Sequence, residues 1–413
     1  MSTTTDAPTA DAGSPHLEPK VREALDRKRA HRGVDVQEPI ELDVISERLN
    51  AFLASRVEGD FAITDLGRLP GGASKEQFVF TLDRTVDGEA RSDRMVLRMD
   101  PLGSPVESSR SREAEVLAIV GTSSVPVPVL YWSTDDASEL GAPALISEFI
   151  TGVSGPSDTP ATASGLGVTY GSRLRPILAE QYVRHLATLH TIDWASHDLT
   201  AFERPRPGTT DAIDWRLAST DRAWDDDAFQ PHPTVTLTRQ WLWRNRPVLD
   251  TVSIVHGDYR NGNFLFDEAS GQMTAVLDWE LTYLGDRHHD LAYAMMAGWG
   301  ETDAETGDFY CSALLTRKDL IEQYEALSGL SVDEERLRYY LVLNMYWAVV
   351  ALSASLPRNA EERLTHLEVM GNFLSGLGVY YIDLLNDMVG TPDAATPATT
   401  PTDATPDATT PEA

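Results

Sequence analysis

One stretch, residues 254–296, places the tightest limits on what this chain can fold into. Asp258 closes a His-Gly-Asp turn at the end of an apolar run, and Asn263 follows five positions later. Two short apolar runs with a Ser-Gly turn signal between them come next, and the second ends at Asp278. We expect the two runs to pair as a hairpin, which would bring Asp278 back beside Asn263. The stretch therefore predicts three polar side chains gathered at one point of the fold.

These residue types suit phosphoryl transfer. That reaction needs a carboxylate that orients the attacking hydroxyl and accepts its proton, and oxygen ligands that hold Mg²⁺ against the phosphates. Asp258 suits the first task, and Asn263 and Asp278 suit the second, at the Asp-x-x-x-x-Asn spacing of kinase catalytic loops. The alternative is that these are ordinary surface side chains on loops. Because Gly285-Asp286 and Asp290-Leu291-Ala292 also follow at short distance, phosphotransfer is the favoured interpretation.

The motif set resembles the aminoglycoside phosphotransferase family of small-molecule kinases, and within it the branch related to the kinase domain of acyl-CoA-dehydrogenase-linked proteins. The resemblance is carried by residues 256–263 (HGDYRNGN), 277–280 (LDWE), 285–286 and 290–292. It implies an α+β, bilobal protein-kinase-like fold. A small N-terminal lobe would hold an antiparallel β-sheet plus a helix, and a larger C-terminal lobe would be mainly helical.

The same resemblance implies roles for individual residues. Asp258 would be the catalytic base, with Arg260 near the transferred phosphate. Asn263 and Asp278 would be metal ligands. Asp290 would be mainly structural and would hold the catalytic loop.

A glycine turn between two predicted strands is the candidate nucleotide-covering loop. Gly71, Gly72 and Ser74 precede the alternating residues 78–82, and glycines let backbone N–H groups approach a phosphate closely. Gly-Gly before a strand is also a common hairpin. The glycine turn precedes the motif block by about the length of a small lobe, and this position favours the nucleotide-covering loop. Apolar residues at helical spacing predict a helix before it, over residues 40–56.

Arg98, on a predicted strand over residues 95–99, stands where kinases place a phosphate-pairing lysine. Arginine keeps the charge but is planar and bulkier, so the exchange is not neutral. Glu113, near the start of the next predicted helix, is the expected partner of Arg98. Glu115 is the competing candidate, and the alternative for either glutamate is a position facing solvent.

The hinge between the lobes is expected at Thr151-Gly152, after predicted strands over residues 125–132 and 143–150. By the resemblance, backbone groups of Glu148, Phe149 and Ile150 would bind the adenine edge. The chain thus divides into four predicted segments: a disordered or loosely helical extension (1–39), a nucleotide-binding lobe (40–150), a catalytic and substrate lobe (151–388), and a disordered Thr/Pro/Ala tail (389–413).

Three features outside the motif block have two interpretations each. The basic cluster Arg27-Lys28-Arg29 is expected on a solvated helix face, with a docking element as the alternative. His190, on a predicted helix over residues 178–192, is expected to be a satisfied core histidine. The tryptophans of residues 194–247 belong to the core or, as the alternative, to the acceptor pocket. Residues 339–356 carry no charge but are expected to form a buried central helix and no membrane span.

Charge and composition narrow the partners. The formal net charge of −30, of which residues 386–413 contribute −5, disfavours nucleic acid and anionic membranes. The excess of acidic residues is expected to serve solubility, and the alternative is an acidic site for a cationic substrate. The lone Cys311 fits a reducing compartment, and the chain opens without a secretion signal, so a cytoplasmic location is expected.

The sequence therefore predicts an enzyme that transfers the γ-phosphoryl group of ATP, with GTP possible and Mg²⁺ required, to a hydroxyl group of a small molecule. A hydroxyacyl-type or other alcohol-bearing metabolite is the first candidate acceptor, and an aminoglycoside-like drug is the second. The alternatives are a nucleotide-binding pseudokinase and a protein kinase. The latter is disfavoured because Asp290-Leu291-Ala292 follows Asp278 too soon for an activation segment.

Overall fold

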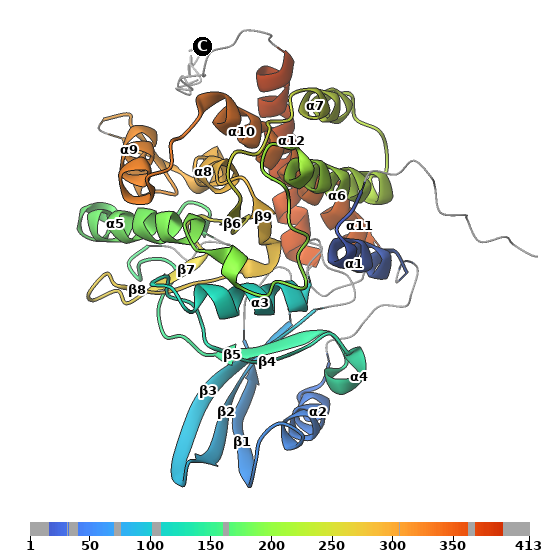
Figure 1. The fold of residues 1–413 in the computed structure, drawn as a ribbon, viewed down its shortest axis with the longest axis vertical. Coiled ribbons are helices and arrows are strands. Elements are labelled where there is room, and N and C mark those ends of the chain that lie inside the picture. The colour runs from blue at the N-terminus through green and yellow to red at the C-terminus, as the bar shows by residue number, and fades with distance from the viewer. Residues whose placement is uncertain are drawn as a thin grey trace, which may run out of the picture.

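The computed structural model describes residues 16–30, 32, 40–69, 76–100, 109–159, 165–304, 306–361 and 368–390. Figure 1 shows a small lobe built on one sheet and a larger lobe made mainly of helices. This is the α+β, two-lobed arrangement expected from the sequence. The predicted nucleotide-covering loop with Gly71, Gly72 and Ser74, and nearly all of the predicted tail, lie outside the described residues.

The small lobe is an antiparallel sheet with the strand order β1-β2-β3-β5-β4. Its long hairpin turns at Asp87-Gly88, where φ is 53° and 83°, because a two-residue hairpin turn of this twist needs positive φ at both positions. The strands are β1 Phe61–Arg68, β2 Glu76–Val86, β3 Glu89–Met99, β4 Leu130–Thr134 and β5 Ala144–Glu148.

One face of this sheet is covered by α2 Leu42–Ala54, which confirms the helix expected there. Phe78 and Phe80 lie two positions apart on β2, so both point to the same side of the sheet, where they are fully buried. Ile45 and Leu49, four residues apart on α2, meet them in one apolar core. The residues two apart on β2 and those four apart on α2 thus bury the same interface from its two sides.

β4 is shorter than the strand predicted over residues 125–132. It begins at Leu130, after Pro126 and Pro128, because proline has no N–H to donate to a strand ladder. The carbonyl of Pro126 instead accepts the backbone N–H of Val276 in the large lobe at 2.7 Å. The proline segment therefore connects the lobes and adds no length to the sheet.

The helix α3 Arg110–Val120 lies between the two lobes (Figure 1). It contacts β4 and β5 on the small-lobe side and the 3₁₀ turn Trp279–Leu281 on the large-lobe side. A short helix, α4 Ala137–Leu140, packs on α2. Any shift of α3 would thus be felt in both lobes.

The large lobe is a set of helices around one continuous apolar core. The tryptophans Trp194, Trp224, Trp241 and Trp243 pack against that core, as expected for aromatics at such spacing. Its helices are α5 Gly171–His190, α6 Asp211–Asp227, α7 Pro233–Arg244, α8 His288–Ala294, α9 Arg317–Ser328, α10 Glu334–Val350, α11 Leu356–Glu361 and α12 Glu368–Gly390. Its strands are β6 Ser253–Val255, β7 Phe264–Phe266, β8 Met273–Val276, β9 Tyr283–Gly285, β10 Glu301–Thr302, β11 Phe309–Cys311 and β12 Leu315–Thr316.

The uncharged stretch predicted to be a central helix is α10, continued by a π-helical turn over Ala351–Ser355. The segment Glu334–Glu361 is long and apolar enough to cross a membrane, but 67% of its most apolar window is buried inside the structure. There α10 packs against α7, α8 and α12. The expectation of a buried central helix is confirmed.

The N-terminal extension contains a docked helix, α1 Pro19–Ala30, so the expected solvated face is wrong for Lys28. Lys28 is buried, and its Nζ lies 2.7 Å from Oδ2 of Asp227 on α6. A charge removed from water requires an opposite charge. The partner stands 199 residues away in the chain, so no local sequence pattern could point to it.

Candidate active site

The loop that carries Asp258 is held by a buried carboxylate. Asp290 accepts hydrogen bonds from the backbone N–H groups of His256 at 2.7 Å and Gly257 at 2.8 Å, and from Nε2 of His190 at 3.1 Å. Burial alone would raise the pKa of Asp290, but the hydrogen bond from His190 and the neighbouring histidines lower it below its usual value. His190 also contacts the Tyr324 hydroxyl, so it is the satisfied core histidine that was expected.

Gly257 is required at its position for two reasons. Its φ of 84° lies in the left-handed region, which side chains with a Cβ avoid. A Cβ there would also lie 2.6 Å from the carbonyl oxygen of Leu281. The glycine of the His-Gly-Asp turn thus lets the loop that carries Asp258 pass close to the segment that follows Asp278.

Asp258 is oriented from two sides and is almost buried, at 8% exposure. Nδ2 of Asn263 donates to Oδ2 of Asp258 at 2.6 Å and to its carbonyl at 2.9 Å. Nε of Arg260 donates to Oδ1 of Asp258 at 2.8 Å, and the guanidinium stacks 3.9 Å above the Trp299 ring. Tyr293 is buried, and burial and the nearby Asp258 carboxylate raise the pKa of its phenol. Sequence reasoning missed both aromatic residues.

Asp278 lies beside this pair because β7 and β8 form the expected hairpin. The backbone N–H of Leu277 donates to the carbonyl of Asn263 at 2.8 Å, which fixes the two segments side by side. Asp278 itself adopts φ 68° and ψ 55°. A left-handed residue with a Cβ costs on the order of 1 kcal/mol, and such outliers concentrate at functional sites.

Asn263 and Asp278 offer the hard oxygen donors that Mg²⁺ takes. Because Asp258 engages the amide nitrogen of Asn263, the amide oxygen is the end left for a cation. Within the described ranges, no group of three His, Cys, Asp or Glu side chains could hold a metal ion. Two protein ligands fit Mg²⁺ when phosphate and water oxygens complete its shell, which is the usual arrangement at nucleotide sites.

Arg98, on β3, connects the small lobe to this centre. Its Nη1 donates to Oε1 of Glu113 at 2.6 Å, and its Nη2 donates to Oδ1 of Asp278 at 3.1 Å. Burial alone would lower the pKa of Arg98, but the two carboxylates raise it, so the guanidinium stays charged. Glu115, the competing candidate, instead accepts the backbone N–H of Thr200 at 3.1 Å.

Arg110 belongs to the same network, although sequence analysis did not single it out. It is 0% exposed and forms an ion pair with Glu113, one turn later on α3. Its Nη2 also lies 3.0 Å from Oδ1 of Asp100 and 3.7 Å from Oε2 of Glu280. The three-residue spacing of Arg110 and Glu113 was a signal in the sequence, but the contacts with Asp100 and Glu280 depend on the fold.

The residues predicted at the adenine edge lie where β5 ends. The backbone N–H of Glu148 donates to Val129 at 2.8 Å, and that of Phe149 donates to Arg94 at 3.0 Å. Both N–H groups are therefore used inside the small lobe, and the adenine contact expected of the backbone groups of residues 148–150 stays a prediction. The assignments of Gly71, Gly72 and Ser74 stay predictions, since these residues are outside the described ranges.

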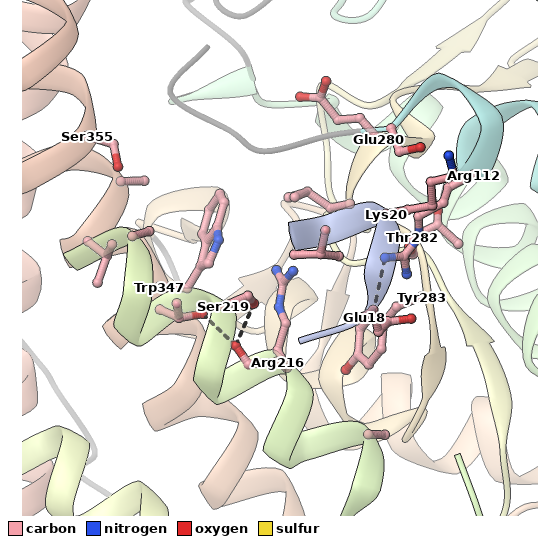
Figure 2. A pocket seen from close by; sticks show the side chains of 18 residues that line it. Glu18, Lys20, Arg112, Arg216, Ser219, Glu280, Thr282, Tyr283, Trp347 and Ser355 are labelled. Carbon is pink, nitrogen blue, oxygen red and sulfur yellow. Dashed lines mark hydrogen bonds and ion pairs between the residues drawn. The ribbon is translucent and has the colours of Figure 1, made fainter. Parts of the chain in front are cut away.

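A cavity lies beside the centre described above. It has a volume of about 760 Å³ including its open mouth, and it is bounded by α1, α3, α6, α10 and residues 280–283. Its charged lining residues are Glu18, Lys20, Arg112, Arg216 and Glu280 (Figure 2). Neither Asp258 nor Asn263 lines it, so we do not assign the cavity to the reacting centre.

Comparison with known proteins places this site in a family. A model of the phosphotransferase enzyme family matches residues 65–330. Acyl-CoA dehydrogenase family member 10 of Mus musculus is 26% identical over 302 residues, and family member 11 of Rattus norvegicus is 31% identical over 245 residues. These matches cover 70% and 54% of this chain but only 26% and 29% of the relatives. The aminoglycoside 3′-phosphotransferase of Streptomyces fradiae is 26% identical over 238 residues, which cover 57% of this chain and 79% of that enzyme.

Solved structures share the kinase-like fold. A putative aminoglycoside phosphotransferase from Ralstonia eutropha JMP134 superposes with a TM-score of 0.55 at 20% identity, over 82% of this chain and 98% of that one. A thermostable mutant of aminoglycoside phosphotransferase APH(4)-Ia, in a ternary complex with ADP and hygromycin B, gives a TM-score of 0.50 at 17% identity, over 79% and 95%. The family model matches more than half of the chain, on a fold shared with small-molecule kinases, and the chain therefore belongs to the phosphotransferase enzyme family.

Proposed function

We propose that this phosphotransferase moves the γ-phosphoryl group of ATP, with Mg²⁺, onto a hydroxyl group of a small metabolite. The observation that carries the proposal is the contact of Asp258 with Asn263, beside which the β7–β8 hairpin returns Asp278. One base and two oxygen ligands are what phosphoryl transfer asks of a protein. The three residues come from one stretch of chain and meet at one point.

Each residue of the site has a task in this proposal. Asp258 orients the acceptor hydroxyl and takes its proton. Asn263 has two tasks, because its amide nitrogen fixes Asp258 while its amide oxygen would be a ligand of the cation. Asn263 and Asp278 would hold Mg²⁺, which would supply positive charge to neutralise the phosphates. Arg98 contacts the nucleotide phosphates from the small lobe, and Arg260 holds Asp258 next to the transferred phosphate.

Two observations support the proposed nucleotide. The solved APH(4)-Ia complex contains ADP, which favours an adenine nucleotide for this chain, and GTP remains the alternative. Arg98 keeps a positive charge where kinases carry lysine and already contacts Asp278. A nucleotide phosphate entering here would meet a guanidinium that Glu113 holds in place.

The acceptor is proposed from the relatives. Several curated relatives are named as acyl-CoA dehydrogenase family members, which favours a hydroxyacyl-type or other alcohol-bearing metabolite. This chain spans about a quarter to a third of those proteins, so their whole activity is not carried over. An aminoglycoside-like acceptor is second, supported by the Streptomyces fradiae enzyme and by the net charge of −30. The buried, unpaired Cys311 supports a reducing, cytoplasmic setting.

A ligand-induced thermal shift tests the nucleotide and the metal together. ATP and GTP are added with and without Mg²⁺ to the wild type, to Asp278→Ala, and to Asp267→Ala as a matched control. Asp267 is exposed at the far end of the same hairpin and accepts from Ser270. A hundredfold excess of ligand over its dissociation constant stabilises a protein by about 2.7 kcal/mol, so the shift is measurable.

The expected result is stabilisation by Mg²⁺-nucleotide in the wild type and the control but not in Asp278→Ala. Equal stabilisation of all three proteins would remove Asp278 from the metal site. Candidate acceptors are then screened with the nucleotide that binds, with Asp258→Asn as the inactive reference. Nucleotide binding without transfer to any acceptor would favour the second function, a nucleotide-binding pseudokinase, for which Arg98 in place of lysine is the supporting observation.

A further inference from the structure

The helix α1 is anchored in the large lobe by a buried charge cluster. Asp227, at the end of α6, is 0% exposed and lies 2.7 Å from Nζ of Lys28. It also forms an ion pair with Arg32 and accepts the hydroxyl of Ser355 at 2.5 Å. Ser355 is the last residue of the π-helical turn after α10. One carboxylate therefore joins α1 to two elements of the large lobe.

Apolar contacts and a second ion pair set the direction of α1. Leu17 and Leu25 are buried against Ala218 of α6. Asp26 accepts from Arg222, also on α6, at 2.5 Å. The helix thus lies along α6 (Figure 1), whereas α2, the next helix in the chain, covers the small-lobe sheet. Consecutive helices are attached to different lobes.

The residue just before α1 reaches α3, the helix between the two lobes. Oε2 of Glu18 accepts from Nη1 of Arg112 on α3 at 3.1 Å (Figure 2). Nη2 of Arg112 donates to the carbonyl of Thr282 at 3.2 Å, and its guanidinium lies 4.5 Å from the centre of the Phe202 ring. Glu18 and Arg112 are both at least nine-tenths buried. Arg112 is therefore the point where α1, α3 and the segment after Asp278 meet.

Arg112 and Glu113 are neighbours on α3 but face different partners. Successive side chains on a helix point about 100° apart. Arg112 accordingly meets Glu18, while Glu113 meets Arg98, which in turn reaches Asp278. A displacement of the first turn of α3 would move both contacts together.

We propose that Arg112 is a positioning residue for the nucleotide site, and that α1 holds it in place through Glu18. The large lobe anchors α1 at Asp227, α1 fixes the first turn of α3, and α3 sets the position of Glu113 and Arg98. On this proposal, the N-terminal helix α1 helps to position the nucleotide site. The role in nucleotide binding rests on the proposed function; the coupling of α1 to α3 does not.

The test uses the full-length chain with Glu18→Gln, which removes the charge and keeps the shape. Glu23→Gln is the matched control, because Glu23 lies on α1, close to Glu18 in the chain, but pairs with Lys20 at the surface. Glu325→Gln is a second control that weakens a hydrogen bond to Val332 in the large lobe, away from α1 and α3. Two quantities are measured for each protein: hydrogen–deuterium exchange of residues 110–120, and the dissociation constant of Mg²⁺-ATP.

We expect exchange in residues 110–120 to rise roughly tenfold in Glu18→Gln, with no rise in α5, and to stay at the wild-type rate in Glu23→Gln. The dissociation constant of Mg²⁺-ATP should rise about fivefold or more, the usual size of coupling between sites. General loss of stability, as in Glu325→Gln, would raise exchange in both lobes and leave the dissociation constant unchanged.

Unchanged exchange in residues 110–120 of Glu18→Gln would overturn the coupling. Faster exchange with an unchanged dissociation constant would overturn the positioning role. If the wild type binds no nucleotide, the proposed function fails instead, and the exchange rates still decide whether α1 positions α3.

Discussion

Replacing Asp290 by asparagine tests how the loop that carries Asp258 is held. The substitution keeps the size of the side chain and removes its charge. One carboxylate oxygen accepts from the backbone N–H of His256 and from His190, and the other accepts from the N–H of Gly257. An amide has only one oxygen. In its better orientation, the amide of the variant would therefore turn its NH₂ group toward the N–H of Gly257.

The cost follows from these contacts. One hydrogen bond to a charged acceptor is lost, worth about 1.5–3 kcal/mol, and a buried N–H is left without a partner, at about 1–3 kcal/mol. We therefore expect Asp290→Asn to lower the free energy of unfolding by about 3–5 kcal/mol. That range agrees with the usual effect of breaking a buried charge pair. At about 2.1 cal/mol/K of unfolding entropy per residue, a chain of this size would lose roughly 3–6 °C in Tm.

Thermal and urea unfolding of the wild type and Asp290→Asn measure this difference. Asp267→Asn is the control, because Asp267 also accepts a backbone N–H, from Ser270 at 2.8 Å, but at the surface. Its Tm should stay close to that of the wild type. A Tm of Asp290→Asn within about 2 °C of the wild type would refute the idea that this carboxylate holds the loop.

Two further predictions concern single residues. Gly257→Ala should destabilise the fold by more than Gly59→Ala in urea unfolding. Both glycines have φ near +80°, but of the two only Gly257 would bring a Cβ to 2.6 Å from the carbonyl oxygen of Leu281. Equal losses, of about 1–2 kcal/mol each, would show that this close approach costs nothing. Burial lowers the pKa of His185 to about 4, so its neutral ring stabilises the folded state above pH 6.5 and that contribution is lost as the pH falls toward 4. Between pH 7 and pH 5 this group should lower the free energy of unfolding by about 2 kcal/mol, and the effect should be absent in His185→Gln. The same pH dependence of the free energy of unfolding in both proteins would contradict the burial argument.

The site could be predicted where its residues are close in sequence. Asp258, Asn263 and Asp278 fall within one stretch, and a two-strand hairpin suffices to bring them together. Residue type and spacing therefore carried the information. The partner of Arg98 could also be chosen correctly, because Glu113 lies on the next helix and shares the network of that arginine.

What could not be predicted depends on contacts between distant segments. The buried pair of Lys28 and Asp227 joins residues 199 positions apart, and a basic cluster on a short helix gives no hint of it. Arg110 shows the same limit, since its contact with Glu280 spans the two lobes. The start of β4 was missed for a local reason: apolar residues continued through two prolines that cannot join a ladder.

Three arginines make the seam between the small lobe and the segment around Asp278. Arg98 meets Asp278, Arg110 meets Glu280, and Arg112 meets the carbonyl of Thr282. Such polar contacts lie beside the apolar packing of α3 in the large-lobe core, and they differ from it because a charged group can exchange one partner of opposite charge for another. Under the proposed function, a nucleotide phosphate that reaches Arg98 would compete with the Asp278 carboxylate for the guanidinium, so nucleotide binding would change a contact between the small lobe and the segment around Asp278.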